Sequence, residues 1–218
     1  MKTISNTLKT LLKLTLILIL LVSCKETPKT SGSDESKIME GLMNEVTGKN
    51  VDINEKYDLL LKELGMKTPL TNEQLMEAFP KKLSNLSLDA AENKNVEPKI
   101  LDSQLVAGSF GDDTVRMEIL DAGGQKAVGA IIPLKMLHLN KITSESNNTI
   151  RYTKKERNGI LTFGTDRDED TKADFQAELR FLYDNRFYVT LEGKGMDTEA
   201  LWNALGIDNL KRFKEYNK

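Results

Sequence analysis

The stretch LRFLYDNRFYVTL, residues 179–191, decides the fold. Apolar and aromatic residues occupy every second position in two short runs, as one buried face of a β-strand requires. The first run is Leu179, Phe181 and Tyr183, and the second is Phe187, Val189 and Leu191. A two-residue turn at 184–185 would break the match between these faces, whereas a three-residue loop ending at Arg186 pairs Tyr183 with Phe187. The stretch therefore predicts an antiparallel hairpin with a three-residue loop.

Two further hairpins are predicted before this one. Asn158 and Gly159 both tolerate the positive φ of a type I′ turn, and they join predicted strands at 149–156 and 160–163. Residues 111–113 separate two other β-type patterns, 103–110 and 114–120. In the second of these, Val115, Met117 and Ile119 alternate with charged residues. The three hairpins together predict about six antiparallel strands.

Helices are predicted before, between and after these hairpins. Thr71 followed by Gln74 has the form of a capping box, and Pro80 ends the helix that begins there. The apolar spacing over residues 125–140 favours a helix over a strand, although Pro133 lies in its middle. A last helix is predicted with residue 197 or 198 as N-cap and a glycine at 206 as C-cap. These elements predict an α+β fold: an antiparallel sheet of about six strands with helices packed on one face, preceded by a helical N-terminal arm.

The N-terminus has the pattern of a secretory signal peptide. A basic stretch precedes an apolar run at 14–22, and the small residue Ser23 follows it. The run is too short for a permanent membrane span, which needs about 20 residues. It ends in Leu21-Val22-Ser23-Cys24, which resembles the lipobox of bacterial lipoproteins.

This resemblance implies a lipid anchor at Cys24. It implies diacylglycerol attached through the Cys24 sulfur, cleavage before Cys24, and a further acyl chain such as palmitate on the new amino terminus. Two or three chains make the attachment effectively permanent, since one chain alone anchors only reversibly. Lys25 follows the cysteine, and by resemblance to the sorting pattern of diderm lipoproteins it favours the outer membrane over the inner one. The alternative that stays open is an ordinary cleaved signal with an incidental cysteine.

The chain divides into four predicted segments. Residues 1–23 are the signal peptide, 24–36 a flexible tether, 37–67 a helical arm and 68–218 the α+β domain. The arm contains two amphipathic patterns, and Gly65 ends the second one. The sequence leaves open whether the arm docks on the domain, and it leaves the oligomeric state open as well.

Composition argues against several functional classes. The 218 residues contain one cysteine and one histidine, which excludes a disulfide framework, a Cys/His zinc site and most histidine-based catalysis. The formal net charge of −2 argues against nucleic acid as a partner. No cofactor, metal or catalytic residue is predicted. Cys24, as the lipid attachment site, is the one site residue that the sequence predicts.

Three features suggest sites but have simpler explanations. His138 is more consistent with a partly buried imidazole bonded to a backbone carbonyl than with a catalytic base. Gly123-Gly124 lack the spacing of a phosphate loop and fit a strand-to-helix turn. A basic strand predicts an exposed, charge-rich edge that resists aggregation. Its residues are Arg151, Lys154, Lys155 and Arg157.

An acidic run has part of the pattern of a calcium-binding loop. Asp166, Asp168 and Asp170 occupy alternate positions, as the ligands of such a loop do. The sixth position is Thr171 instead of glycine, and the twelfth is Ala177 instead of glutamate, so two geometric requirements fail together. The run therefore predicts a solvated hairpin tip.

Residues 69–213 resemble a group of uncharacterised bacterial envelope proteins. The motifs are Pro69-Leu70-Thr71 at a helix start, Ile119-Leu120-Asp121 before a Gly-Gly turn, and residues 193–197 before the last helix. The resemblance implies no catalytic residues. We therefore expect a lipid-anchored cell-envelope lipoprotein that is not an enzyme and binds or assembles with an envelope protein. Two alternatives stay open: a carboxylate-dependent hydrolase of an envelope polymer, and a carrier of a small apolar ligand.

Overall fold

The computed structural model describes residues 51–90, 96–140, 144–146, 149–168 and 172–217. The predicted signal peptide, the tether with Cys24 and the first pattern of the helical arm lie outside the described residues. So do Asp170 and Thr171 of the acidic run. In the part of the chain that the structure describes, no helix combines the length and the apolarity that a membrane crossing requires.

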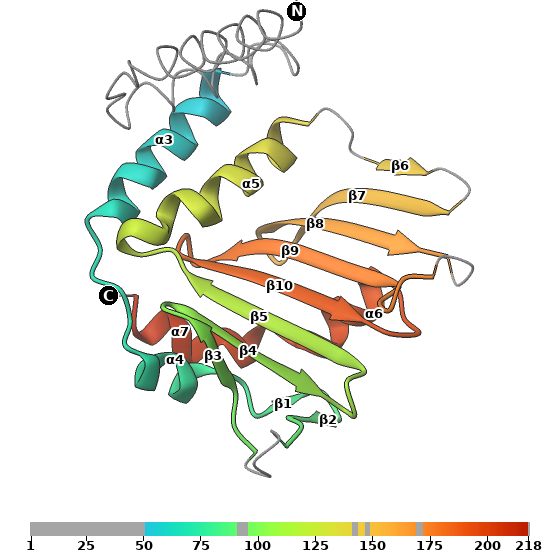
Figure 1. Cartoon of the computed structure of the whole chain (residues 1–218). Helices are drawn as coiled ribbons and strands as arrows, with labels where there is room; N and C mark the ends of the chain where they lie inside the picture. Colours follow the sequence, from blue (N-terminus) through green and yellow to red (C-terminus); the bar gives the residue numbers. More distant parts are fainter. Residues whose placement is uncertain (1–50, 91–95, 141–143, 147–148, 169–171, 218) are drawn as a thin grey trace, which may run out of the picture. The chain divides into compact units, whose positions relative to one another are not determined.

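Eight strands form one antiparallel sheet in the order β3-β4-β5-β10-β9-β8-β7-β6 (Figure 1). Their bounds are Lys99–Asp102 (β3), Leu105–Phe110 (β4), Val115–Asp121 (β5), Ser144–Ser146 (β6), Ile150–Arg157 (β7), Ile160–Arg167 (β8), Ala177–Tyr183 (β9) and Phe187–Gly193 (β10). A separate small hairpin joins β1 (Lys82–Leu83) to β2 (Leu86–Ser87). The predicted α+β class with an antiparallel sheet is confirmed. The two edge strands, β3 and β6, extend the sheet beyond the six strands expected.

The central hairpin has the predicted register. Tyr183 lies opposite Phe187 and Phe181 lies opposite Val189, so the three-residue loop is confirmed. Asp184 and Asn185 in this loop adopt left-handed conformations, with φ of 49° and 53°. The Asn158-Gly159 turn is also confirmed, with φ of 52° and 76° and strands paired directly on either side of it.

The last residue of the central loop, Arg186, takes part in a buried ion pair. Its Nε lies 2.6 Å from Oδ1 of Asp121, which is fully buried at the end of β5. Oδ2 of Asp121 also accepts a hydrogen bond of 2.7 Å from the backbone N–H of Leu70. Arg186 Nη2 donates to the Thr68 carbonyl at 2.9 Å. The pair therefore ties the segment before α4 to the end of the sheet.

One face of the sheet is covered by α4 (Asn72–Ala78), α6 (Thr198–Leu205) and α7 (Lys211–Glu215). The predicted capping box at Thr71 and Gln74 begins α4, and Asp197 caps α6 by accepting from the Ala200 N–H. The core between these layers includes Phe181, whose ring meets that of Trp202 edge-on at 5.5 Å between centroids. The three helices therefore bury the apolar side chains of this face, which we call the closed face.

The opposite face carries α3 (Val51–Gly65) and α5 (Ala127–Leu139), which follows the short 3-10 turn η1 (Gly124–Lys126). Both helices pack over one end of the sheet, against side chains such as Leu120, Leu182 and Tyr188. Helices thus cover both faces, which corrects the predicted packing on one face (Figure 1). The physical reason is that the second face of the sheet also carries apolar side chains, among them Leu120, Leu182 and Tyr188, which α3 and α5 cover.

The described part of the predicted arm docks on the domain. Tyr57 and Leu64 of α3 are buried in the same cluster as Ile131 and Leu134 of α5. The Lys135 Nζ, almost fully buried, lies 2.9 Å from Oδ1 of Asp58 and joins the two helices. The helix predicted over 125–140 is confirmed, with Pro133 inside it. Pro133 cannot donate to the carbonyl of Gly129, but Gly129 is exposed, so water can supply that bond.

Candidate functional site

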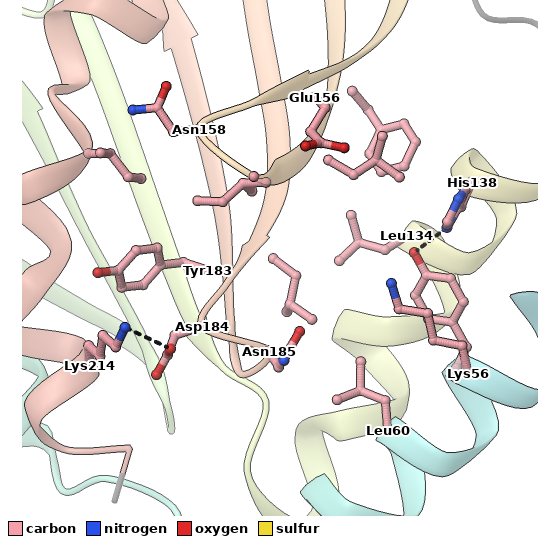
Figure 2. Close-up of a pocket in the computed structure, with 17 residues that line it drawn as sticks. Lys56, Leu60, Leu134, His138, Glu156, Asn158, Tyr183, Asp184, Asn185 and Lys214 are labelled. Atoms are coloured by element: carbon pink, nitrogen blue, oxygen red, sulfur yellow. Dashed lines mark hydrogen bonds and ion pairs between the residues drawn. The ribbon is translucent and has the colours of Figure 1, made fainter.

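A cavity of about 610 Å³ lies between the ends of two hairpins and the helices α3 and α5 (Figure 2). We call this cavity the slot. It is lined by side chains of α3, of α5, of the β7–β8 turn and of the β9–β10 loop, together with Ile207 and Lys214. Residues from distant parts of the sequence therefore meet there.

The slot exists because two neighbouring strands stop pairing before their hairpins end. The pairing of β8 with β9 ends at Thr162 and Phe181. The β7–β8 hairpin continues to the pair Arg157–Ile160, and the β9–β10 hairpin continues to Tyr183–Phe187. Both hairpin ends line the slot.

The floor of the slot is apolar and only half-buried. Its members come from α3, from both hairpins and from the 3-10 turn η2 (Ile207–Leu210) after α6. They are Leu60, Ile160, Leu161, Leu182 and Ile207. Most ligand pockets combine such an apolar lining with a few polar groups that orient the ligand.

The rim of the slot supplies the polar groups. Lys56, Glu156, Asn158 and Asn185 are exposed, and their side chains form no hydrogen bond or ion pair with any other described residue. The carboxylate of Asp184 differs, because it accepts a 2.7 Å hydrogen bond from the Asn217 side-chain amide. The Lys214 ammonium lies 3.9 Å from the same Asp184 carboxylate. Apart from this pair, the rim offers one ammonium, one carboxylate and two amides to a ligand.

His138 and Tyr57 form a pair at the helix side of the slot. The His138 Nδ1 lies 3.1 Å from the Tyr57 hydroxyl, and the two rings meet edge-on. Burial raises the pKa of Tyr57 to about 12. Burial, with the nearby charges of Lys154 and Lys56, lowers the pKa of His138, so the imidazole is neutral at pH 7. The predicted partly buried imidazole is present, but its bonding partner is a hydroxyl and not the backbone carbonyl expected.

The acidic run has a structural role in its described part. The Asp166 carboxylate accepts from the Thr198 N–H at 2.7 Å, next to the start of α6, and pairs with Arg151 at 2.8 Å. Asp168 is exposed, and its backbone N–H donates to the Thr149 carbonyl at 3.0 Å. Among the described residues, no three histidine, cysteine, aspartate or glutamate side chains gather to hold a metal ion.

The glycine pair fits the predicted strand-to-helix turn. Gly123 donates its N–H to Oδ1 of Asp121 at 3.0 Å, and Gly124 begins the 3-10 turn before α5 with φ of 65°. The turn is therefore bonded to Asp121, the same carboxylate that pairs with Arg186.

The basic strand β7 is bonded to the rest of the domain. Lys154 Nζ donates to the carbonyl oxygen of His138 at 2.9 Å, near the end of α5. Lys155 pairs with Glu199 of α6 at 3.0 Å, and Arg157 is buried against Thr162 and Glu199. Among the described strands, the short β6 pairs with residues 151–153, and the remainder of β7 forms an edge of the sheet. The edge is predicted to be exposed, but Arg157 is buried there because it bonds to Thr162 and Glu199.

A second polar surface covers the part of the sheet that α3 and α5 leave open. Along β5, β9 and β10, every second residue points to this surface, and these residues include charged side chains of both signs. The residues between them point to the opposite, apolar face. Arg167 pairs with Glu178 at 3.0 Å, and Arg116 lies 3.7 Å from Glu192. Burial raises the pKa of Glu192. Because these charges neutralise one another, the surface lacks a net sign that would select a charged partner.

Sequence reasoning did not find the slot. In the sequence, Asn158 indicates only a turn, and neither Lys56 nor Glu156 stands out. Comparisons with protein-family models, with curated proteins and with solved structures found no match. The slot is therefore a candidate site on the strength of its geometry alone.

Proposed function

We propose that this chain is a lipid-anchored cell-envelope lipoprotein whose α+β domain binds another envelope component at the slot, without chemistry. The main support for a binding role is the rim of the slot. Four unpartnered polar side chains surround an apolar floor there: Lys56, Glu156, Asn158 and Asn185. Unpartnered polar groups around such a floor are suited to orient a ligand. The anchor is supported by the lipobox-like Leu21-Val22-Ser23-Cys24.

The two alternative functions have less support. A hydrolase of the kind considered needs two carboxylates that act together, one as acid and one as base or nucleophile. In the slot, Asp184 is already bonded to Asn217, which leaves Glu156 as the carboxylate that is available. A carrier of an apolar ligand needs an enclosed apolar cavity, whereas the slot is open and has a charged rim. A binding role therefore needs only the groups that the slot already provides.

The anchor is tested by changing the lipidated residue. We expect Cys24→Ser to move the protein out of the membrane fraction while the domain keeps its melting temperature, because the thiol that accepts the lipid is lost. Lys25→Asp is the matched control, which should stay in the membrane fraction but change its distribution between inner and outer membranes. An unmodified mature N-terminus at another position, found by mass spectrometry, would contradict the proposal.

The binding role is tested by photocrosslinking on intact cells. A photoreactive phenylalanine analogue placed at Asn185, on the rim, should give a discrete adduct with an envelope component. The same analogue at Lys82, an exposed residue of β1 that does not line the slot, should give none. Identical products from both positions, or no product from position 185, would contradict binding at the slot.

A further inference from the structure

Four charged side chains line the slot, and two of them, Asp184 and Lys214, lie 3.9 Å apart as an ion pair. The other two, Lys56 and Glu156, have opposite charges and stand on different walls. Lys56 projects from α3 and Glu156 from β7, and the Leu134 side chain lies between them (Figure 2). Neither charge has a partner among the described residues. A ligand with one sign of charge would pair with one of these groups and repel the other. A ligand with a positive and a negative end can satisfy both.

The floor and the amides add two further requirements. Leu161 and Leu182 are half-buried, so an aliphatic side chain laid on them would remove apolar surface from water on both molecules. Asn158 and Asn185 each offer two donors and a carbonyl acceptor. A peptide group offers one N–H and one C=O, which matches the side-chain amide in both roles. A neutral saccharide could hydrogen-bond to the amides and to both charged groups, but it would bring no opposite charge to either one.

The size of the slot agrees with a small ligand. A volume of about 610 Å³ lies within the range of roughly 300–1,000 Å³ that small-molecule sites occupy. We propose that the slot binds a short peptide with free termini, its ammonium on Glu156, its carboxylate on Lys56 and an apolar side chain on the leucine floor. This inference rests on the proposed function, because it names the ligand class of the same site.

Calorimetric titration of the full chain in detergent tests the inference with a defined probe. The probe is the tripeptide Ala-Leu-Ala with free termini, and the control is the same tripeptide with an acetylated N-terminus and an amidated C-terminus. We expect the capped peptide to bind at least tenfold more weakly, since hydrogen bonds to charged groups account for about that factor each. Replacement of the central leucine by glycine should also weaken binding, through loss of the floor contact.

Variants of the chain locate the two charge contacts. Glu156→Gln and Lys56→Gln should each weaken binding of the free tripeptide about tenfold and should reduce the advantage of the free over the capped form. Glu77→Gln and Lys82→Gln, exposed residues away from the slot, should leave both affinities unchanged. Melting temperatures equal to that of the unmodified chain show that each variant is folded. Equal binding of the free and capped peptides, or full affinity in the two slot variants, would overturn the inference.

The disaccharide of N-acetylglucosamine separates failure of the inference from failure of the proposed function. If the disaccharide binds at the slot and the tripeptide does not, the peptide class is wrong and the binding role stands. If neither probe binds, the peptide inference is overturned, and the crosslinking experiment at Asn185 decides the binding role independently.

Discussion

The two faces of the sheet differ in how completely they are covered. On the face under α4, α6 and α7, Phe181, Val189 and Leu191 are fully buried. On the other face, α3 and α5 cover one end, and Leu182 and Tyr188 remain half-buried. Because stability depends mainly on apolar burial, the closed face carries most of it. The open face keeps accessible groups, and the slot lies at its border.

The largest expected effect comes from the closed face. Phe181→Ala should lower the free energy of unfolding by about 3–5 kcal/mol, because it leaves a cavity in a fully buried site next to Trp202. Chemical denaturation of residues 25–218 measures this loss. Leu179 and Leu182 provide a matched pair on β9, since the first faces the closed layer and the second faces the slot. A loss from Leu182→Ala as large as that from Leu179→Ala would contradict the difference between the faces.

The buried ion pair joins the two regions and gives the second prediction. Asp121→Asn should cost about 3 kcal/mol, because Arg186 then keeps a buried charge without its partner. The same denaturation experiment measures it. Lys126→Gln, which removes an ion pair with the exposed Asp102, is the control and should cost less than about 1 kcal/mol. Equal losses of unfolding free energy in the two variants would mean that the buried Asp121–Arg186 pair stabilises the fold no more than an exposed pair does.

Local sequence signals predicted much of the fold. Thr71 with Gln74 located a helix start, Asn158 with Gly159 located a hairpin, and the match of Tyr183 with Phe187 fixed a register. These signals are carried by residues close together in the chain, whose conformational preferences act directly. The α+β class followed from them.

The remaining features depend on distant residues. β3 and β6 are short edge strands without alternation, KILD and SES, so nothing in their own sequences predicts a partner. The second helical layer depends on which face of the sheet α3 and α5 pack against, and the spacing within a helix does not specify that face. The slot brings together residues near 56, 134, 156 and 185, and only the tertiary packing places them around one cavity.

The third prediction concerns how α3 docks on the open face as pH changes. The pKa of His138 is lowered in the folded state by burial and by Lys154 and Lys56, so the unfolded chain binds a proton more readily. This contribution to stability is present above about pH 6.5 and is lost as pH falls from there towards the folded pKa. Denaturation between pH 7.5 and 5.5 should show the loss, and His138→Gln should reduce the slope. An unchanged slope in that variant would assign the effect to other groups.

The smallest effect is expected at the acidic run. Asp168→Ala should change the free energy of unfolding by less than about 0.5 kcal/mol, because the side chain is exposed. Thermal melts with and without calcium should give the same result for this variant and for the unmodified chain. A large loss that occurs only with calcium would establish a metal site in this run.

Amide hydrogen exchange of the full chain, with and without detergent-solubilised envelope material, tests most directly whether binding takes place at the slot. The account predicts slower exchange at residues 156–161 and 182–185, where the two hairpin ends line the slot. It predicts no change in α4 and α6, which cover the closed face. Slower exchange confined to α4 and α6, or no change in any segment, would contradict binding at the slot.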